Sequence, residues 1–182
     1  MTDAAATTPT LPDPPFVFVT VGTDHHRFDR LVDLCEAWAK DRGVALFVQT
    51  GTSRPAAAGA GAAYLPFPTM AEAMAGAAAV VCHGGPATIM LARQCGRTPI
   101  VVPRDPEREE HVDGHQQKFS RWMADKGQIA LAPEEADLVA HLDEAMAHPE
   151  RYRVADGDET AAAVAEFTRL VDDLVDRRRG RR

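Results

Sequence analysis

The sequence has no long apolar run and no leader-like start. Hydrophobic residues make up 45% of its 182 residues, yet no stretch reaches the roughly 20 consecutive apolar residues that a membrane-spanning helix needs. The N-terminus also has no basic segment followed by an apolar core, so no signal peptide is expected. These absences predict a cytoplasmic chain that does not itself span a membrane.

Cysteine and positive charge are both scarce. The three cysteines, Cys35, Cys82 and Cys95, lie within apolar patterns and lack the paired spacing of metal ligands, which predicts reduced core thiols. The formal net charge of −7 argues against broad nucleic-acid binding. The arginine-rich residues 177–182 are the exception. They are expected to form a solvated basic tail, or to contact anionic lipid or an acidic partner.

Apolar runs of strand length alternate with helical patterns along the chain. Residues 1–15, rich in alanine, threonine and proline, are expected to be disordered, and residues 16–176 to form one domain. Strands are predicted at residues 16–21, 44–48, 63–67, 78–82, 99–102 and 129–131. Helices are predicted from residue 28 to Gly43, at 70–74, at 87–95, at 133–146 and at 159–176, and a further helix after residue 117 is predicted to end at Gly127. Residues 53–62 are expected to be a mobile loop.

These strands are continuously apolar, which is typical of a parallel sheet covered on both faces. The predicted fold is therefore α/β, a Rossmann-like parallel sheet with helices on both faces. Ligands of such sheets bind beyond the carboxyl ends of the strands. Three polar segments should meet there: residues 22–28, 83–88 and 104–117.

The most informative motif is His83-Gly84-Gly85-Pro86-Ala87-Thr88, between a predicted strand and a predicted helix. Glycines allow an anion to approach the backbone closely, and the N-terminus of a helix attracts phosphate. The histidine adds a side-chain donor. The motif predicts a diphosphate site, and hence a nucleotide or nucleotide-sugar ligand. A tight strand–helix turn without a ligand is the alternative.

The first polar segment contains a glycine and two histidines. Gly22 permits a tight turn, and His25 and His26 could donate to phosphate or transfer protons. In the alternative, Thr23 or Asp24 caps the following helix and the histidines are solvated.

The third polar segment contains His111 and His115, which would share a face of a helix as zinc ligands do. Gly114 weakens a helix there and the usual catalytic glutamate is missing, so no metal site is expected. Side chains that hydrogen-bond sugar hydroxyls fit the segment better, and a solvated helix entry is the alternative.

In this order, three motifs resemble those of the glycosyltransferase family 28 C-terminal domain, the carboxyl-terminal half of a GT-B enzyme, over roughly residues 16–147. They are Phe18-Val19-Thr20-Val21-Gly22-Thr23 followed by Phe28-Asp29-Arg30-Leu31, then Cys82-His83-Gly84-Gly85-Pro86-Ala87-Thr88, and then Pro99-Ile100-Val101-Val102-Pro103 with His115-Gln116.

The resemblance implies a role for each matched position. Gly84, Gly85 and Thr88 would hold the diphosphate of a UDP-sugar, and His115 and Gln116 would contact its sugar. Residues Gly22, Thr23, His25 and His26 would face the diphosphate and sugar from the first loop.

One position departs from the family. A glutamate that binds the ribose hydroxyls is common in the family, and Leu91 stands in its place here. A leucine cannot accept a hydrogen bond, so either Glu107, Glu109 or Glu110 takes over or nucleotide affinity is weak.

The resemblance covers only one half of a GT-B enzyme. It implies the donor-binding catalytic subunit of a two-component glycosyltransferase that moves a hexose or N-acetylhexosamine from a UDP-sugar to a lipid-linked or polysaccharide acceptor. The partner would be a membrane-anchored, Alg14-like acceptor-binding subunit that recruits this chain to the inner face of the membrane. No cofactor is expected. The general base is expected from the partner or from His26, then His25.

Two other functions remain open at this point. The chain could be a nucleotide-sugar-binding module without catalysis, an alternative that Leu91 keeps open. It could also be a metal-dependent hydrolase that uses His83, His111 and His115.

Overall fold

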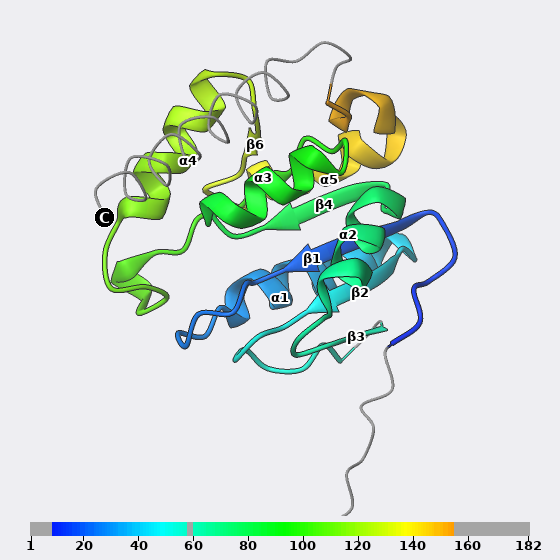
Figure 1. The fold of residues 1–182 in the computed structure, drawn as a ribbon, viewed down its shortest axis with the longest axis horizontal. Coiled ribbons are helices and arrows are strands. Elements are labelled where there is room, and N and C mark those ends of the chain that lie inside the picture. Colours follow the sequence, from blue (N-terminus) through cyan, green and yellow to red (C-terminus); the bar gives the residue numbers. More distant parts are fainter. Residues whose placement is uncertain (1–8, 58–59, 155–182) are drawn as a thin grey trace, which may run out of the picture.

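The computed structural model describes residues 9–57 and 60–154. They form a six-stranded sheet in the order β3-β2-β1-β4-β5-β6 (Figure 1). The strands are β1 (Phe16–Thr20), β2 (Ala45–Gln49), β3 (Ala60–Ala62), β4 (Ala79–Cys82), β5 (Ile100–Val101) and β6 (Ala130–Leu131). Every strand pair in this described sheet is parallel, which confirms the predicted sheet type.

Helices cover both faces of the sheet. They are α1 (Asp29–Arg42), α2 (Phe67–Gly76), α3 (Pro86–Gln94), α4 (His115–Asp125) and α5 (Glu135–Ala147), with short 3-10 turns η1 (Pro106–Arg108) and η2 (Pro149–Tyr152). Val17 and Val19 share a core with α1 and α5, whereas Phe16 and Phe18 point to the opposite face and pack with α2 and α3. The predicted Rossmann-like α/β fold is therefore confirmed.

The first helix follows its sequence pattern closely. Its apolar stripe, which includes Leu31, Cys35 and Trp38, is buried against the sheet. The helix ends at Gly43, which adopts a left-handed conformation with φ of 64° and donates its N–H to the carbonyl of Ala39. Glycine is favoured there because it has no Cβ to strain.

The prediction for the third strand is wrong. The strand is formed by residues 60–62, inside the predicted loop, and Phe67 begins α2 instead of ending a strand. A Cβ on Gly61 would lie within 3.0 Å of the Val48 backbone, so this edge strand sits close against β2. Backbone pairing and small side chains define the strand, and hydrophobic patterning does not detect them.

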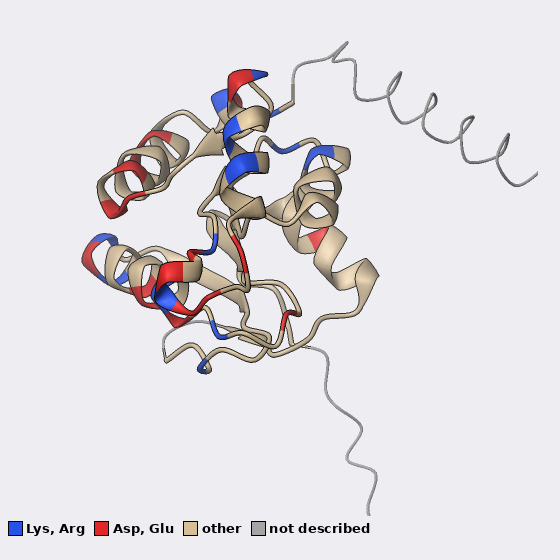
Figure 2. Cartoon of the chain, turned by 90° about the vertical axis from the view of Figure 1, so that its left-hand side faces the viewer, with Lys and Arg blue, Asp and Glu red and all other residues tan. Residues whose placement is uncertain are grey.

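The cysteines fit the prediction of core thiols. All three are free, and burial raises the pKa of Cys35 and Cys82 to about 12. Cys95 is half-buried. Acidic and basic residues are mixed along α1, whereas α5 carries acidic residues and no lysine or arginine (Figure 2).

Several predictions for the chain ends lie outside the described residues, namely the helix at 159–176 and the basic tail at 177–182. Of the N-terminal segment, residues 9–15 form neither helix nor strand, although Leu11 packs against the core. None of the helices in the described part of the chain combines the length and the apolar character of a membrane span.

Candidate functional site

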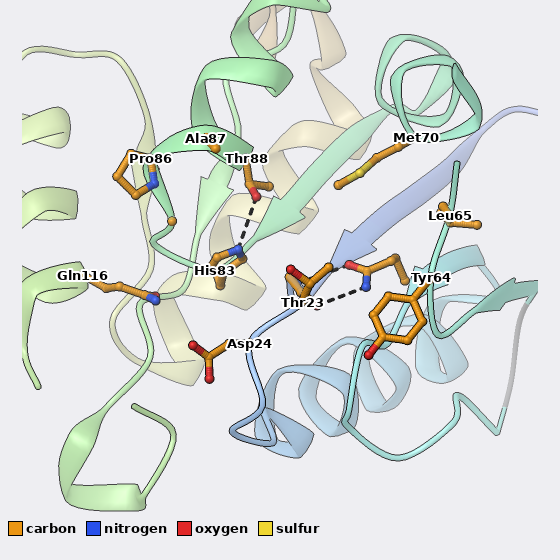
Figure 3. A pocket seen from close by; sticks show the side chains of 13 residues that line it. Thr23, Asp24, Tyr64, Leu65, Met70, His83, Pro86, Ala87, Thr88 and Gln116 are labelled. Carbon is orange, nitrogen blue, oxygen red and sulfur yellow. Dashed lines mark hydrogen bonds between the residues drawn. The ribbon is translucent and has the colours of Figure 1, made fainter. Parts of the chain in front are cut away.

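A cavity of about 400 Å³ lies at the carboxyl ends of β1, β2 and β4 (Figure 3). The first loop supplies Gly22, Thr23 and Asp24, and the glycine turn with the start of α3 supplies His83 and residues 85–88. All three predicted polar segments therefore contribute to the cavity, the third of them through Gln116 alone. Tyr64, Leu65 and Met70 add an apolar side that the sequence patterns did not predict.

The imidazole of His83 is packed between two glycines. A Cβ on Gly22 or on Gly85 would lie less than 3.0 Å from ring atoms of His83. Gly22 also has φ of +83°, a conformation that favours glycine. Glycine is therefore required at both positions to make room for the His83 ring, in addition to any bound anion.

His83 is held as a neutral side chain. Its Nε2 lies 3.2 Å from Thr88 Oγ1, while its buried Nδ1 has no hydrogen-bond partner among the described residues. Burial, reinforced by the positive charge of Arg104, lowers the pKa of His83 to about 4. The ring can therefore offer a hydrogen bond at neutral pH but no charge.

Folding stability should depend on pH through His83. The pKa of His83 is about 4 when folded and 6.5 in its unperturbed state, so between these values the unfolded chain binds a proton that the folded chain does not. Stability is then lost as the pH falls from 6.5 to 4, by roughly 3 kcal/mol. Urea unfolding of the wild type and of His83→Gln at several pH values would measure this. An equally steep loss in His83→Gln would assign the effect to another group, although Asp24 is excluded because its pKa is about 2.

The N-terminus of α3 opens into the same cavity. Pro86 occupies the first turn of the helix, and Ala87 and Thr88 line the cavity. The first N–H groups of a helix have no acceptor within the helix, and together with the helix dipole they attract anions. Gly84 lies behind the turn, where a Cβ would collide with Ser120. It thus lets α4 pack against the turn.

Gln49, at the end of β2, shapes the first loop. Its side chain accepts a hydrogen bond from the N–H of Gly22 (3.2 Å) and donates to the carbonyl of Gly22 (3.0 Å) and to that of Ala63 (2.7 Å). The side-chain amide of Gln49 therefore satisfies both backbone polar groups of Gly22, as the backbone of a neighbouring strand would. The only signal in the sequence is a glutamine that ends an apolar run.

Within the first loop, Asp24 and His26 form a dyad. Asp24 Oδ1 accepts hydrogen bonds from the backbone N–H of His26 (2.8 Å) and from its Nδ1 (2.6 Å). Burial alone would raise the pKa of Asp24, but these hydrogen bonds and Arg104 lower it to about 2. The alternative in which Asp24 or Thr23 caps α1 is wrong, because Phe28 occupies the N-cap and no side chain caps it. His25, by contrast, is 82% exposed.

Arg104 is a buried side chain that connects the first loop to the segment around Glu110. Its side chain is 1% exposed and donates to the carbonyls of Val21 (2.7 Å), His26 (2.8 Å) and Glu110 (2.9 Å). Its guanidinium also lies 4.8 Å from the ring centre of Phe28. Burial lowers its pKa, an effect that Asp24 and Glu110 oppose, and an arginine stays charged at neutral pH.

The third polar segment contributes little to the cavity. Gln116 lines it, and the Oε1 atom of Gln116 is buried without a partner among the described residues. His115 does not line the cavity; its ring contacts Asp113 and His111. The two members of the predicted pair therefore face different surroundings.

The carboxylates proposed to replace the ribose-binding glutamate are also elsewhere. Glu110 makes a two-pronged ion pair with Arg30 (both contacts 2.8 Å) and accepts from the N–H of Asp105, so its role is structural. Glu107 and Glu109 do not line the cavity. Leu91 packs on the core beside α2. Asp24 is the carboxylate that does line the cavity.

Comparison with known proteins gives a consistent result. The model of the glycosyltransferase family 28 C-terminal domain matches residues 16–174. Two curated relatives, from Pseudomonas fluorescens (strain SBW25) and Stutzerimonas stutzeri (strain A1501), are both named UDP-N-acetylglucosamine–N-acetylmuramyl-(pentapeptide) pyrophosphoryl-undecaprenol N-acetylglucosamine transferase. Each is 31% identical, over 58% and 66% of this chain, which spans only 30% and 34% of their lengths.

A solved structure shows the same fold. MurG from Acinetobacter baumannii superposes with a TM-score of 0.52 and 18% identity, over 78% of this chain and 44% of that protein.

Proposed function

Because this chain belongs to the glycosyltransferase family 28 C-terminal domain family, we propose that it is the donor-binding catalytic subunit of a two-component glycosyltransferase. It binds a UDP-sugar and transfers a hexose or N-acetylhexosamine to a lipid-linked or polysaccharide acceptor. The names of the curated relatives, which specify a UDP-N-acetylglucosamine donor, support this donor class.

The observation that carries the proposal is the cavity at the start of α3. The helix N-terminus offers N–H groups to a diphosphate without a metal ion, and Thr88 adds a hydroxyl beside His83. Gln116 lines the same cavity, and its side-chain amide could form a hydrogen bond with a sugar hydroxyl. The apolar side around Tyr64 suits a nucleobase.

The ribose hydroxyls are bound differently from the family pattern. Leu91 is half-buried and packs against the core, so we assign the hydroxyl acceptor of the cavity to Asp24, whose Oδ1 is engaged by His26. The non-catalytic binding module remains the second candidate, because nucleotide affinity without the usual glutamate would be weak. The metal-dependent hydrolase is not favoured, since His83 belongs to neither group of possible metal ligands in the described chain.

We further propose that a second chain supplies the acceptor half of the active site. This chain spans about a third of the length of the curated relatives it matches. A membrane-anchored, Alg14-like subunit would bind the acceptor and bring this chain to the inner face of the membrane.

Calorimetry with UDP tests the donor site. Thr88→Ala should weaken UDP binding by about 2- to 10-fold, the typical effect of one lost hydrogen bond. Gly85→Val should abolish binding, because its Cβ would displace the His83 ring and the turn. Thr98→Ala, at the opposite end of the sheet, is the control and should bind normally.

A chelator should leave UDP binding unchanged, since no metal is required. Thermal unfolding of each variant would separate a lost site from a lost fold. Wild-type affinity in a folded Gly85→Val variant would place the nucleotide elsewhere.

A further inference from the structure

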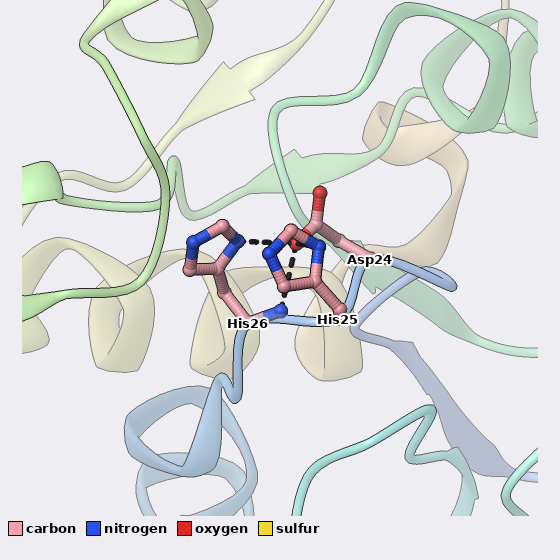
Figure 4. Close-up of side chains that lie close together, drawn as sticks. All are labelled: Asp24, His25 and His26. Atoms are coloured by element: carbon pink, nitrogen blue, oxygen red, sulfur yellow. Dashed lines mark hydrogen bonds and ion pairs between the residues drawn. The ribbon is translucent and has the colours of Figure 1, made fainter.

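Two groups of possible metal ligands lie beside the cavity. One is Asp24, His25 and His26 in the first loop (Figure 4), and the other is His111, Asp113 and His115 in the segment before α4 and at its start. Within each group, one ligand atom from every residue lies within 4.8 Å of the others. The sequence analysis expected no metal site, because Gly114 weakens a helix between His111 and His115 and the usual catalytic glutamate is missing.

Tertiary structure joins the two groups into one cluster through His111. The rings of His26 and His111 have their centres 5.8 Å apart, and those of His111 and His115 are 4.6 Å apart. Nε2 of His111 lies 3.8 Å from Asp24 Oδ2. Four of the seven histidines of the chain are therefore gathered in this cluster.

The spacing of these atoms suits a small cation. Zinc binds histidine nitrogens and carboxylate oxygens at about 2.0–2.2 Å, so an ion between Asp24 Oδ2 and His111 Nε2 could contact both without a large movement. The low pKa of Asp24 keeps its carboxylate ionised at neutral pH. His111 is held in place, because its side chain is only 11% exposed.

We propose that Asp24, His25, His26 and His111 bind one divalent transition-metal ion of the zinc class at the rim of the cavity. Three imidazoles and one carboxylate are a ligand set for zinc, cobalt or nickel and not for magnesium or calcium. Nδ1 of His111 accepts from the backbone N–H of Asp113 (3.4 Å) and lies 3.8 Å from Asp113 Oδ1, so the carboxylate would become its partner when Nε2 binds the ion.

The positive charge of Arg104 is the main opposing factor. Its Nη atoms are engaged by the carbonyls of Val21, His26 and Glu110, so the guanidinium lies under the loop and does not occupy the site. The carboxylates of Asp24 and Glu110 offset its charge.

The ion would inhibit transfer. It would occupy Asp24, the proposed acceptor for the ribose hydroxyls of the donor, and His26, the proposed base for the acceptor proton. This consequence rests on the proposed function, whereas the binding of the ion does not.

Titration of metal-free protein with Zn²⁺, followed by calorimetry, and with Co²⁺, followed by its visible absorption, tests the site. We expect one ion per chain and at least about a tenfold loss of affinity in His111→Ala and in His25→Ala. The second variant removes an exposed ring, so folding is not at stake. His148→Ala is the matched control for His25→Ala, since His148 is also an exposed histidine beside a carboxylate, that of Glu150, and lies outside the cluster.

Equal affinity in the wild type and in His25→Ala and His111→Ala, or no binding by the wild type, would overturn the site. UDP titration in the presence of chelator separates the two proposals. If UDP binds and zinc does not, only the metal site fails; if zinc binds and UDP does not, only the donor site fails.

Discussion

Arg104→Met is expected to destabilise the protein by about 3–5 kcal/mol, the usual effect of breaking a buried charged network on one side. The methionine fills most of the volume but leaves three carbonyls, those of Val21, His26 and Glu110, without their donor. An unpaired buried polar group costs about 1–3 kcal/mol. The first loop should then lose its conformation, and UDP binding with it.

Chemical denaturation measures the change in unfolding free energy, and calorimetry measures the loss of UDP affinity. Arg54→Met is the control, because Arg54 pairs with Asp33 and Glu36 at the surface, where ion pairs contribute little. Equal destabilisation by the two substitutions would show that Arg104 has no special structural role.

Arg104 also shows where sequence patterns stop being informative. Strands β1, β2, β4, β5 and β6, helix α1 and the glycine turn were predictable, because apolar periodicity and glycine placement are local properties. The partners of Arg104 are backbone carbonyls as far as 83 residues away, and no pattern in the sequence signals them. The same holds for Gln49, which looks like an ordinary polar residue at a strand end yet holds both polar groups of the Gly22 peptide.

His115 and Gln116 were predicted to contact the sugar together, but only Gln116 lines the cavity. Their adjacent positions at the start of α4 explain the difference. Successive side chains on a helix point about 100° apart, so Gln116 can line the cavity while His115 faces the histidine cluster. The family resemblance paired them by position. It could not show that Asp113 and His111 surround His115 in this chain.

The chain alone is expected to show little or no sugar transfer, and co-expression with an acceptor-binding membrane subunit should restore it. A single half-domain does not position the acceptor, and positioning supplies on the order of 7–11 kcal/mol of a reaction barrier. Radiolabelled transfer from UDP-N-acetylglucosamine to membrane lipid, with and without the partner, measures this. Full turnover by the purified chain would show that the two-component proposal is wrong.

In the active complex, His26→Ala should lower kcat by about 10²–10⁴-fold while changing donor affinity little, because His26 is proposed to take the acceptor proton. Its Nδ1 is bound to Asp24 at 2.6 Å, which leaves Nε2 available as the base. Asp24→Asn should also lower kcat, because the amide no longer stabilises the charged imidazole. His148→Ala serves as the control, since His148 lies beside Glu150 and outside the cavity and the histidine cluster. If His26→Ala keeps the wild-type kcat and the wild-type dependence of kcat on pH, the base belongs to the partner.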